Sequence, residues 1–136
     1  MEATPAVLRV LVADDFSAWR AAVREILQAR PEWQIVCEVC DGGQAVQEAT
    51  THQPDIVLLD IGMPGMNGIT AAKKIRDVSP GSIILFLTQN LDRGLMNEAF
   101  ALGAEGYVLK TRAWNDLPAA IERCALRRRA AARQTL

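Results

Sequence analysis

The sequence predicts a single doubly wound α/β domain, in which five helices cover both faces of a five-stranded parallel sheet. Three observations support this class. Short apolar runs alternate five times with segments of helical period. The runs lack the polar and apolar alternation of a half-exposed strand, so both of their faces are expected to be buried. Finally, 136 residues suit one domain.

The first strand is expected at residues 8–13, which are almost entirely apolar. A helix follows, because apolar residues recur at helical spacing from Trp19 to Leu27. Ser17 is placed to cap this helix at its start. Residues 33–39 form the second expected strand.

The second and third units are marked by their turns. Residues 41–43 read as a turn into a short helix that ends before Pro54. Residues 56–59 are entirely apolar and form the third expected strand. A loop rich in glycine, proline and methionine at residues 60–67 leads to a third helix, which ends near Ser79.

The last two units complete the sheet. Residues 83–87 and 107–109 are the expected fourth and fifth strands, and a helix over residues 91–102 joins them. Apolar residues then recur with helical spacing over residues 117–126. Pro118 is expected in the first turn of this last helix, where proline is tolerated.

Composition excludes several classes of protein. The net charge of −1 excludes a protein that binds nucleic acid through a basic surface over the whole molecule. The arginines near the end of the chain form a local basic patch. We interpret this patch as the solvated end of a helix. No signal peptide or apolar run of about 18 residues occurs, so we expect a cytoplasmic protein without a membrane span.

Three cysteines are too few for a disulfide scaffold. Cys37 and Cys40 are spaced as C-x-x-C, but an alternating strand would point them to opposite faces. We therefore read them as small buried apolar residues in a reduced compartment rather than as a zinc or redox motif. The lone histidine, His52, is expected to be a solvated surface residue.

Polar residues follow four of the five strands. Asp14 and Asp15 come after the first strand, Asp60 after the third, Thr88 after the fourth and Lys110 after the fifth. Each aspartate alone could simply cap a helix. In an open parallel sheet, however, the residues beyond the carboxyl ends of the strands share one crevice. The sequence therefore predicts that the five side chains converge on one site.

Three neighbouring carboxylates repel one another, and a hard cation removes that repulsion. Mg²⁺ prefers oxygen ligands, whereas Zn²⁺ would favour cysteine or histidine, and neither is expected near this site. We expect Asp14, Asp15 and Asp60 to hold Mg²⁺. The backbone carbonyl of Gly62, in the loop after Asp60, is the expected fourth protein ligand.

A carboxylate can attack phosphorus and form an aspartyl phosphate. Asp60 is the expected nucleophile, because a rigid apolar strand leads directly to it. Lys110 and Mg²⁺ would offset the charge on the phosphoryl oxygens, and the Thr88 hydroxyl would donate to one of them.

These motifs resemble the receiver domain of two-component response regulators. The resemblance rests on Asp14-Asp15, Asp60-x-x-Met63-Pro64, Met66-Asn67-Gly68, Thr88 and Gly106-Tyr107-Val108-Leu109-Lys110. It covers residues 7–128, leaving 1–6 as an N-terminal tail and 129–136 as a C-terminal tail or the start of an interdomain linker. It implies a flavodoxin-like sheet with strand order 2-1-3-4-5. Among receivers, the chain is most similar to those that precede a LuxR/NarL-type DNA-binding output domain.

The resemblance also implies a mechanism. A sensor histidine kinase phosphorylates Asp60 in a Mg²⁺-dependent reaction, and Lys110 pairs with the phosphoaspartate. Thr88 and Tyr107 form the switch, although Tyr107 could also be an edge-strand aromatic that only packs. Residues at positions 62, 89 and 90, here Gly62, Gln89 and Asn90, tune hydrolysis of the phosphoaspartate.

The switch acts on the surface formed by residues 91–102, 107–109 and 117–126. A homodimer would form through this surface or through the first and last helices. DNA is reached only through an output domain that this chain lacks, and the receiver performs no enzymatic reaction beyond its own phosphorylation and slow dephosphorylation.

Two residues depart from the usual receiver pattern, and three other functions are considered as alternatives. Thr111 follows Lys110 where many receivers have proline, and the long side chain of Gln89 could crowd the phosphoryl pocket. The chain could be a stand-alone receiver, or a binding module that works without phosphorylation. A phosphohydrolase with an aspartyl intermediate is disfavoured, because such enzymes of the haloacid dehalogenase type need an acid where Gly62 stands.

Overall fold

The computed structural model describes residues 7–89 and 92–134, with side chains to residue 130. Its five parallel strands form one sheet in the order β2-β1-β3-β4-β5, which confirms the predicted class and order. The strands are β1 (Leu8–Ala13), β2 (Trp33–Val39), β3 (Ile56–Leu59), β4 (Ile83–Thr88) and β5 (Gly106–Leu109). The helices are α1 (Ser17–Leu27), α2 (Gly42–His52), α3 (Gly68–Val78), α4 (Arg93–Ala101), the 3₁₀ turn η1 (Lys110–Arg112) and α5 (Ala113–Gln134).

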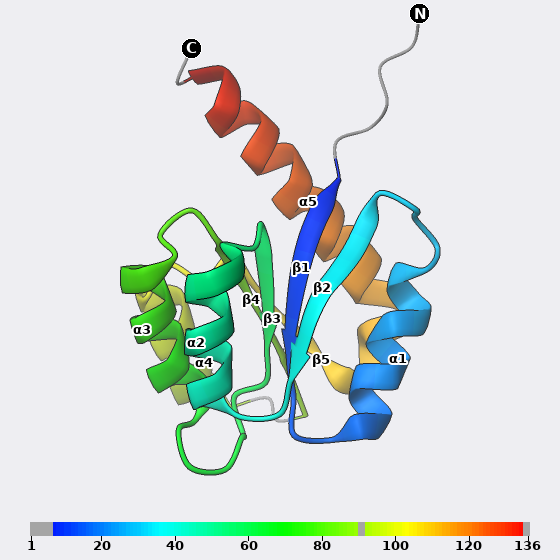
Figure 1. The fold of residues 1–136 in the computed structure, drawn as a ribbon. Coiled ribbons are helices and arrows are strands. Elements are labelled where there is room, and N and C mark those ends of the chain that lie inside the picture. Colours follow the sequence, from blue (N-terminus) through cyan, green and yellow to red (C-terminus); the bar gives the residue numbers. More distant parts are fainter. Residues whose placement is uncertain (1–6, 90–91, 135–136) are drawn as a thin grey trace, which may run out of the picture.

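Helices lie on both faces of the sheet, as Figure 1 shows. Helices α1 and α5 cover one face, and α2, α3 and α4 cover the other. Successive residues of one strand enter different cores: Val10 and Val12 pack under α1 and α5, whereas Leu11 and Ala13 pack under α2 and α3. Since both faces are covered, the central strand β3 is apolar and buried along its whole length, whereas the edge strand β2 also carries Gln34 and Glu38.

The start of α1 differs from the expectation. Phe16, not Ser17, occupies the cap position, and no side chain caps the helix. Ser17 is already the first helical residue. The caps of the next helices follow the usual rule, since the side chains of Asp41 and Asn67 accept hydrogen bonds from backbone N–H groups of α2 and α3.

The last helix is longer than predicted. It begins at Ala113, directly after η1, so Pro118 lies in its second turn and not in its first. The expected start was wrong because it was taken from the apolar stripe that begins at Leu117, whereas Ala113 already packs in the same core. The helix also runs through residues 128 and 129, where the C-terminal tail was predicted to begin. Among the described residues, none of the helices is both long and apolar enough to cross a bilayer.

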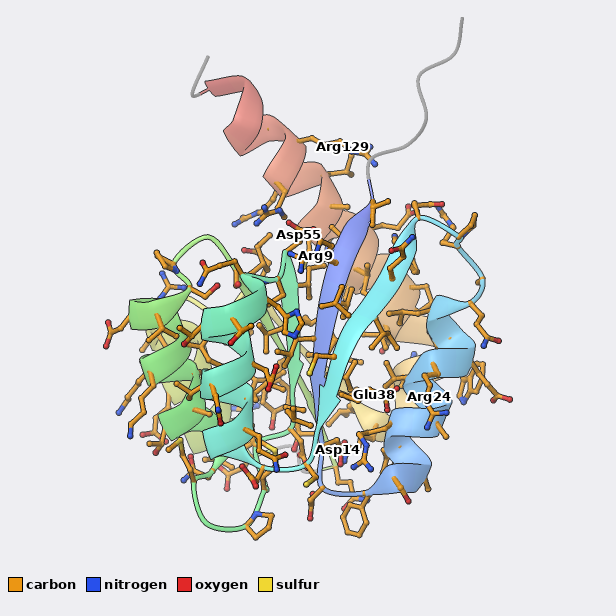
Figure 2. The ribbon with its side chains drawn as sticks, viewed as in Figure 1. Arg9, Asp14, Arg24, Glu38, Asp55 and Arg129 are labelled. Carbon is orange, nitrogen blue, oxygen red and sulfur yellow. The ribbon has the colours of Figure 1, made fainter. Side chains whose placement is uncertain are left out.

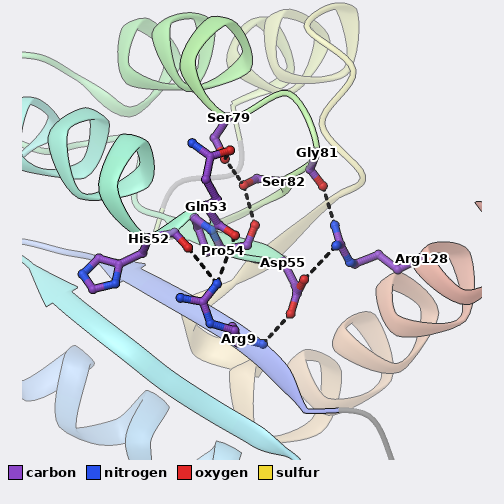
Figure 3. Close-up of polar contacts among 9 residues, drawn as sticks. All are labelled: Arg9, His52, Gln53, Pro54, Asp55, Ser79, Gly81, Ser82 and Arg128. Atoms are coloured by element: carbon purple, nitrogen blue, oxygen red, sulfur yellow. Dashed lines mark hydrogen bonds and ion pairs between the residues drawn. The ribbon is translucent and has the colours of Figure 1, made fainter. Parts of the chain in front are cut away.

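The second half of α5 is tied to the end of the sheet farthest from Asp14 (Figures 2 and 3). Arg128 forms an ion pair of 2.7 Å with Asp55 and donates a hydrogen bond to the carbonyl of Gly81. Asp55 in turn accepts a hydrogen bond of 2.7 Å from the backbone N–H of Arg9. The guanidinium of Arg9 donates to the carbonyl of His52, which joins α2 to the same network.

We expect Arg128→Ala to lower the free energy of unfolding by about 1 kcal/mol, because the substitution removes a partly exposed ion pair and a hydrogen bond. Amide hydrogen exchange should accelerate in the last turns of α5. Arg129→Ala is the matched control, since Arg129 is exposed and lies one residue further along the same helix. Equal effects of the two substitutions in urea unfolding and hydrogen exchange would contradict this role for Arg128.

Candidate functional site

The carboxyl ends of the strands carry a cluster of charged side chains. Because β3, β1 and β4 are neighbours in the sheet, the residues that follow them are brought to one edge. Oxygen atoms from Asp14, Asp15 and Asp60 lie within 4.8 Å of one another. The Lys110 ammonium lies 2.7 Å from Asp14 Oδ2 and 3.5 Å from Asp60 Oδ2. The predicted convergence of these four side chains is therefore present.

Lys110 is almost completely buried, with only 2% of its surface exposed. The rings of Phe16 and Trp19 face its ammonium group, with centroids at 5.6 and 5.3 Å from Nζ. Such contacts with aromatic faces favour a cation. Two carboxylates and two rings thus surround the ammonium group and hold it beside Asp60.

The backbone after β1 orients Asp14 toward the cluster. Asp14 Oδ1 accepts a hydrogen bond of 3.0 Å from the N–H of Phe16, and Arg20 donates one of 2.6 Å to the Asp14 carbonyl. Neither Asp14 nor Asp15 caps α1, since the cap position is Phe16. The simpler capping interpretation of these two aspartates is therefore wrong.

Asp60 is buried, with 6% of its surface exposed. Burial raises the pKa of its carboxyl group above the usual range; Lys110 opposes this rise and Asp14 adds to it. One oxygen, Oδ1, accepts a hydrogen bond of 3.2 Å from the N–H of Gly62. A charged Asp60 therefore costs free energy in the folded protein.

This cost leads to a testable expectation. Asp60→Asn should raise the free energy of unfolding at pH 7 in metal-free buffer by about 1 kcal/mol, because it removes a buried charge without changing the side-chain volume. The pKa of Asp60 is higher in the folded state, so the folded wild type gains stability from this group at low pH and loses it as the pH rises above about 4. Urea unfolding at pH 4 and pH 7 should show a gain only at pH 7. A loss of stability at both values would contradict the argument.

Thr88 and Tyr107 lie on the neighbouring strands β4 and β5, where Tyr107 pairs with Phe86 and Thr88 pairs with Leu109. Thr88 is buried at the end of β4. Burial raises the pKa of the Tyr107 phenol, and a hydrogen bond with the Thr88 side chain partly opposes the rise. Tyr107 therefore does more than pack, because its hydroxyl group contacts the hydroxyl group of Thr88. Their roles in switching remain predictions.

The three predicted tuning positions differ in what surrounds them. Gly62 is exposed, and a Cβ atom added to it would meet no atom within 4 Å, so larger side chains fit at this position. Gln89, directly after Thr88, is exposed. Asn90 lies outside the described residues.

Sequence reasoning missed the residues that hold the site together from α1. Trp19 was placed in the apolar stripe of that helix, but its ring faces Lys110. Arg20 was assigned no role, yet it fixes the Asp14 carbonyl. The sequence did offer one indication. Both residues lie within six positions of Asp14, in the helix that directly follows the first strand.

The cluster fits a hard divalent cation. Its donors are carboxylate oxygens, which Mg²⁺ prefers. Asp15 Oδ1 is buried and has no hydrogen-bond partner among the residues that the structure describes. A buried carboxylate oxygen without a partner is costly, and a cation would satisfy it. Both observations agree with a metal site at Asp14, Asp15 and Asp60.

Comparison with known families gives a match over most of the chain. Residues 10–122 match the family described as the response regulator receiver domain. The matched segment extends from β1 into α5 and contains the whole carboxylate cluster.

Individual relatives agree with this match. The chain is 37% identical over 81% of its length to the protein-glutamate methylesterase/protein-glutamine glutaminase 1 of Methanosarcina acetivorans, of which it covers 32%. It is 34% identical over 85% of its length to the nitrate/nitrite response regulator NarL of Escherichia coli K12, of which it covers 54%. A solved structure of a LuxR-family two-component response regulator from Aurantimonas sp. SI85-9A1 superposes with a TM-score of 0.83 at 32% identity, covering 89% of this chain and 86% of that one. The chain thus spans about a third to a half of the length of these two curated relatives.

Proposed function

The chain belongs to the response regulator receiver domain family, and on this premise we propose that Asp60 accepts a phosphoryl group from a phosphohistidine of a sensor histidine kinase. The observation that carries the proposal is the position of Lys110, which is buried between Asp14 and Asp60. A buried ammonium beside a carboxylate provides the positive charge that a phosphoryl group on that carboxylate requires.

In the proposed step, an oxygen of Asp60 forms a bond to phosphorus while the phosphorus–nitrogen bond of the phosphohistidine breaks. The histidine nitrogen keeps the electron pair and takes up a proton. Lys110 would neutralise the new phosphoryl oxygens, and the Thr88 hydroxyl would donate to one of them. Much of the catalysis is thus the positioning of charges that exist before the reaction.

Asp14, Asp15 and Asp60, with the Gly62 carbonyl, would hold Mg²⁺ in this proposal. When bound, the cation supplies positive charge that lowers the repulsion between the carboxylates and the incoming phosphoryl group. The buried, unpartnered oxygen of Asp15 supports this assignment.

The proposed switch begins at Thr88. Its hydroxyl contacts Tyr107 in the unmodified protein. A donation from Thr88 to the phosphoryl group changes this contact, so Tyr107 is expected to turn inward. A shift from 1% to 99% of the active conformation requires about 5.5 kcal/mol of differential binding, and several charge-assisted contacts together can supply much of it.

The surface that responds would be α4, β5 and α5. It carries two exposed aromatic side chains, Phe100 on α4 and Trp114 on α5. Exposed apolar groups of this kind suit a protein contact. We propose that this surface, or the α1 and α5 pair, forms a homodimer and transmits the signal to an output domain, in the cytoplasm.

The similarity to NarL favours control of a DNA-binding output domain. A second candidate output is a methylesterase, since the identity to the Methanosarcina protein is as high. The receiver itself would perform only its own phosphorylation and dephosphorylation in either case.

Incubation with Mg²⁺ and acetyl phosphate or beryllofluoride tests the proposal. We expect a saturable, Mg²⁺-dependent adduct, detected by intact-protein mass spectrometry for acetyl phosphate and by fluorine NMR for beryllofluoride. Asp60→Asn should abolish the adduct, and Asp77→Asn, which changes an exposed carboxylate on α3, should not. Repeated turnover of phosphomonoesters would instead indicate a phosphohydrolase, and the absence of any adduct would indicate a binding module.

Amide hydrogen exchange tests the switch. Beryllofluoride should change exchange in α4, β5 and the start of α5, in addition to the loops around Asp60. Changes confined to residues 14–60 would contradict the proposed output surface.

A further inference from the structure

A second cluster of possible metal ligands lies between the edge strand β2 and helix α2. Cys37 comes from β2, and Glu48 and His52 come from α2. One ligand atom from each residue lies within 4.8 Å of the other two. The cluster shares no residue with the carboxylate site, and His52 lies near Arg9, toward the opposite end of the sheet from Asp14 (Figures 2 and 3).

An irregularity in β2 directs Cys37 toward α2. The pairing of β1 with β2 shifts between Val10 and Leu11, which pair with Ile35 and Cys37. Ile35 packs on the core under α1 and α5, whereas Cys37 packs on the core under α2. In a regular strand, residues two apart point to the same face. The extra residue between them therefore turns the thiol to the other face, as a β-bulge does.

The other two ligands meet on one side of α2. Glu48 and His52 are four residues apart, so their side chains are neighbours on the helix surface. His52 Nε2 lies 3.1 Å from Glu48 Oε2. Two such ligands on a tetrahedral zinc ion, with bonds of 2.0–2.1 Å, are separated by about 3.3 Å. The observed spacing is thus close to the one that the metal requires.

We propose that Cys37, Glu48 and His52 bind a borderline or soft divalent cation, for which Zn²⁺ is the best fit. A thiolate, an imidazole nitrogen and a carboxylate oxygen are its preferred protein ligands, and water would complete the tetrahedron. Mg²⁺ is a poor fit, because it avoids sulfur and nitrogen. The ligand chemistry therefore separates this site from the carboxylate cluster.

The surroundings permit binding from solution. The side chains of His52 and Glu48 are 31% and 33% exposed, so a hydrated cation can reach them. Burial and the neighbouring Glu48 raise the pKa of the Cys37 thiol, which is protonated in the metal-free protein. Binding would therefore release this proton and replace the contacts that Glu48 now makes.

Cobalt(II) is a suitable probe because it replaces zinc and gives a thiolate charge-transfer absorption. We expect this absorption when Co²⁺ is added to the reduced protein in excess Mg²⁺, and its loss when Zn²⁺ is added. Cys37→Ser should abolish it, and Cys40→Ser should leave it unchanged, since Cys40 is exposed and outside the cluster. An absorption that survives Cys37→Ser, or no absorption in the wild type, would overturn the proposal.

Thermal unfolding gives a second readout that does not depend on sulfur. Zn²⁺ should raise the Tm of the wild type and of Cys40→Ser, because a ligand that binds only the folded state stabilises it. His52→Gln should lose most of this increase while keeping the far-ultraviolet circular dichroism of the wild type. The same increase in His52→Gln as in the wild type would show that zinc binds elsewhere.

Discussion

Lys110→Met lowers the free energy of unfolding by about 3 kcal/mol or more at pH 7 in metal-free buffer, because it leaves buried carboxylates without their counter-charge. The ammonium of Lys110 is paired with both Asp14 and Asp60, and methionine has a similar volume but no charge. Chemical unfolding measured in urea, with the m-value as a check on two-state behaviour, gives the difference directly.

The pH dependence makes this prediction specific. Lys110 lowers the pKa of Asp60, so its removal should let that pKa rise further. A carboxyl with a raised pKa in the folded state contributes stability below its unfolded pKa and loses it as the pH rises. The deficit of Lys110→Met should therefore shrink from pH 7 to pH 4. Lys74→Met, an exposed substitution on α3, should have little effect at either pH. A deficit independent of pH would mean that Lys110 acts through packing.

Gly68→Val should destabilise the protein by about 3 kcal/mol and impair phosphorylation of Asp60. A Cβ atom at position 68 would lie 2.3 Å from the carbonyl oxygen of Asp60 and 2.7 Å from the Cα of Ile61. Both are backbone atoms, so the first turn of α3 or the Asp60 loop must move. The loop is the connection that places the nucleophile, and the substitution therefore disturbs folding and the site together.

Gly81→Ala is the control for this substitution. Gly81 lies in the turn before β4, and a Cβ atom there would meet nothing within 4 Å. The control should change the free energy of unfolding by less than about 0.5 kcal/mol. If Gly68→Val were equally well tolerated, the packing of α3 against the Asp60 backbone would not be a constraint on the site.

The fold was predictable because its strongest signals are repeated and local. Each strand is a short apolar run, and parallel topology requires their carboxyl ends to meet at one edge. The position of Asp60 relative to Lys110 therefore followed from their places after β3 and β5 alone.

Features that depend on one residue were not predictable in the same way. The cap of α1 is Phe16, which has no side-chain acceptor, so propensity favoured the wrong residue, Ser17. The turn η1 begins at Lys110 itself and α5 begins directly after it, so Pro118 lies one turn deeper in the helix than expected. Tertiary packing outweighs local preference at such positions.

The cluster at Cys37 was missed for a related reason. The bulge in β2 turns the side chains that follow it to the opposite faces of the sheet, and no residue in that strand predicts a bulge. With regular alternation, Cys37 would face α1 and α5 together with Ile35. Cys37 and Cys40 were both expected to be buried, but Cys37 is only partly buried and Cys40 is exposed. His52 was expected to be a solvated surface residue, but it is partly buried and paired with Glu48.

Because α5 is long, a small change in its direction near Lys110 would produce a large displacement of its last turn. The helix starts one 3₁₀ turn after Lys110 and, at 1.5 Å per residue, its 22 residues extend for about 33 Å, past the far end of the sheet (Figure 1). It acts as a lever arm, since a tilt of about 10° at its start would displace its last turn by about 6 Å. The ion pairs of Arg127 with Glu105 and of Arg128 with Asp55 hold the second half of this helix against the body of the domain.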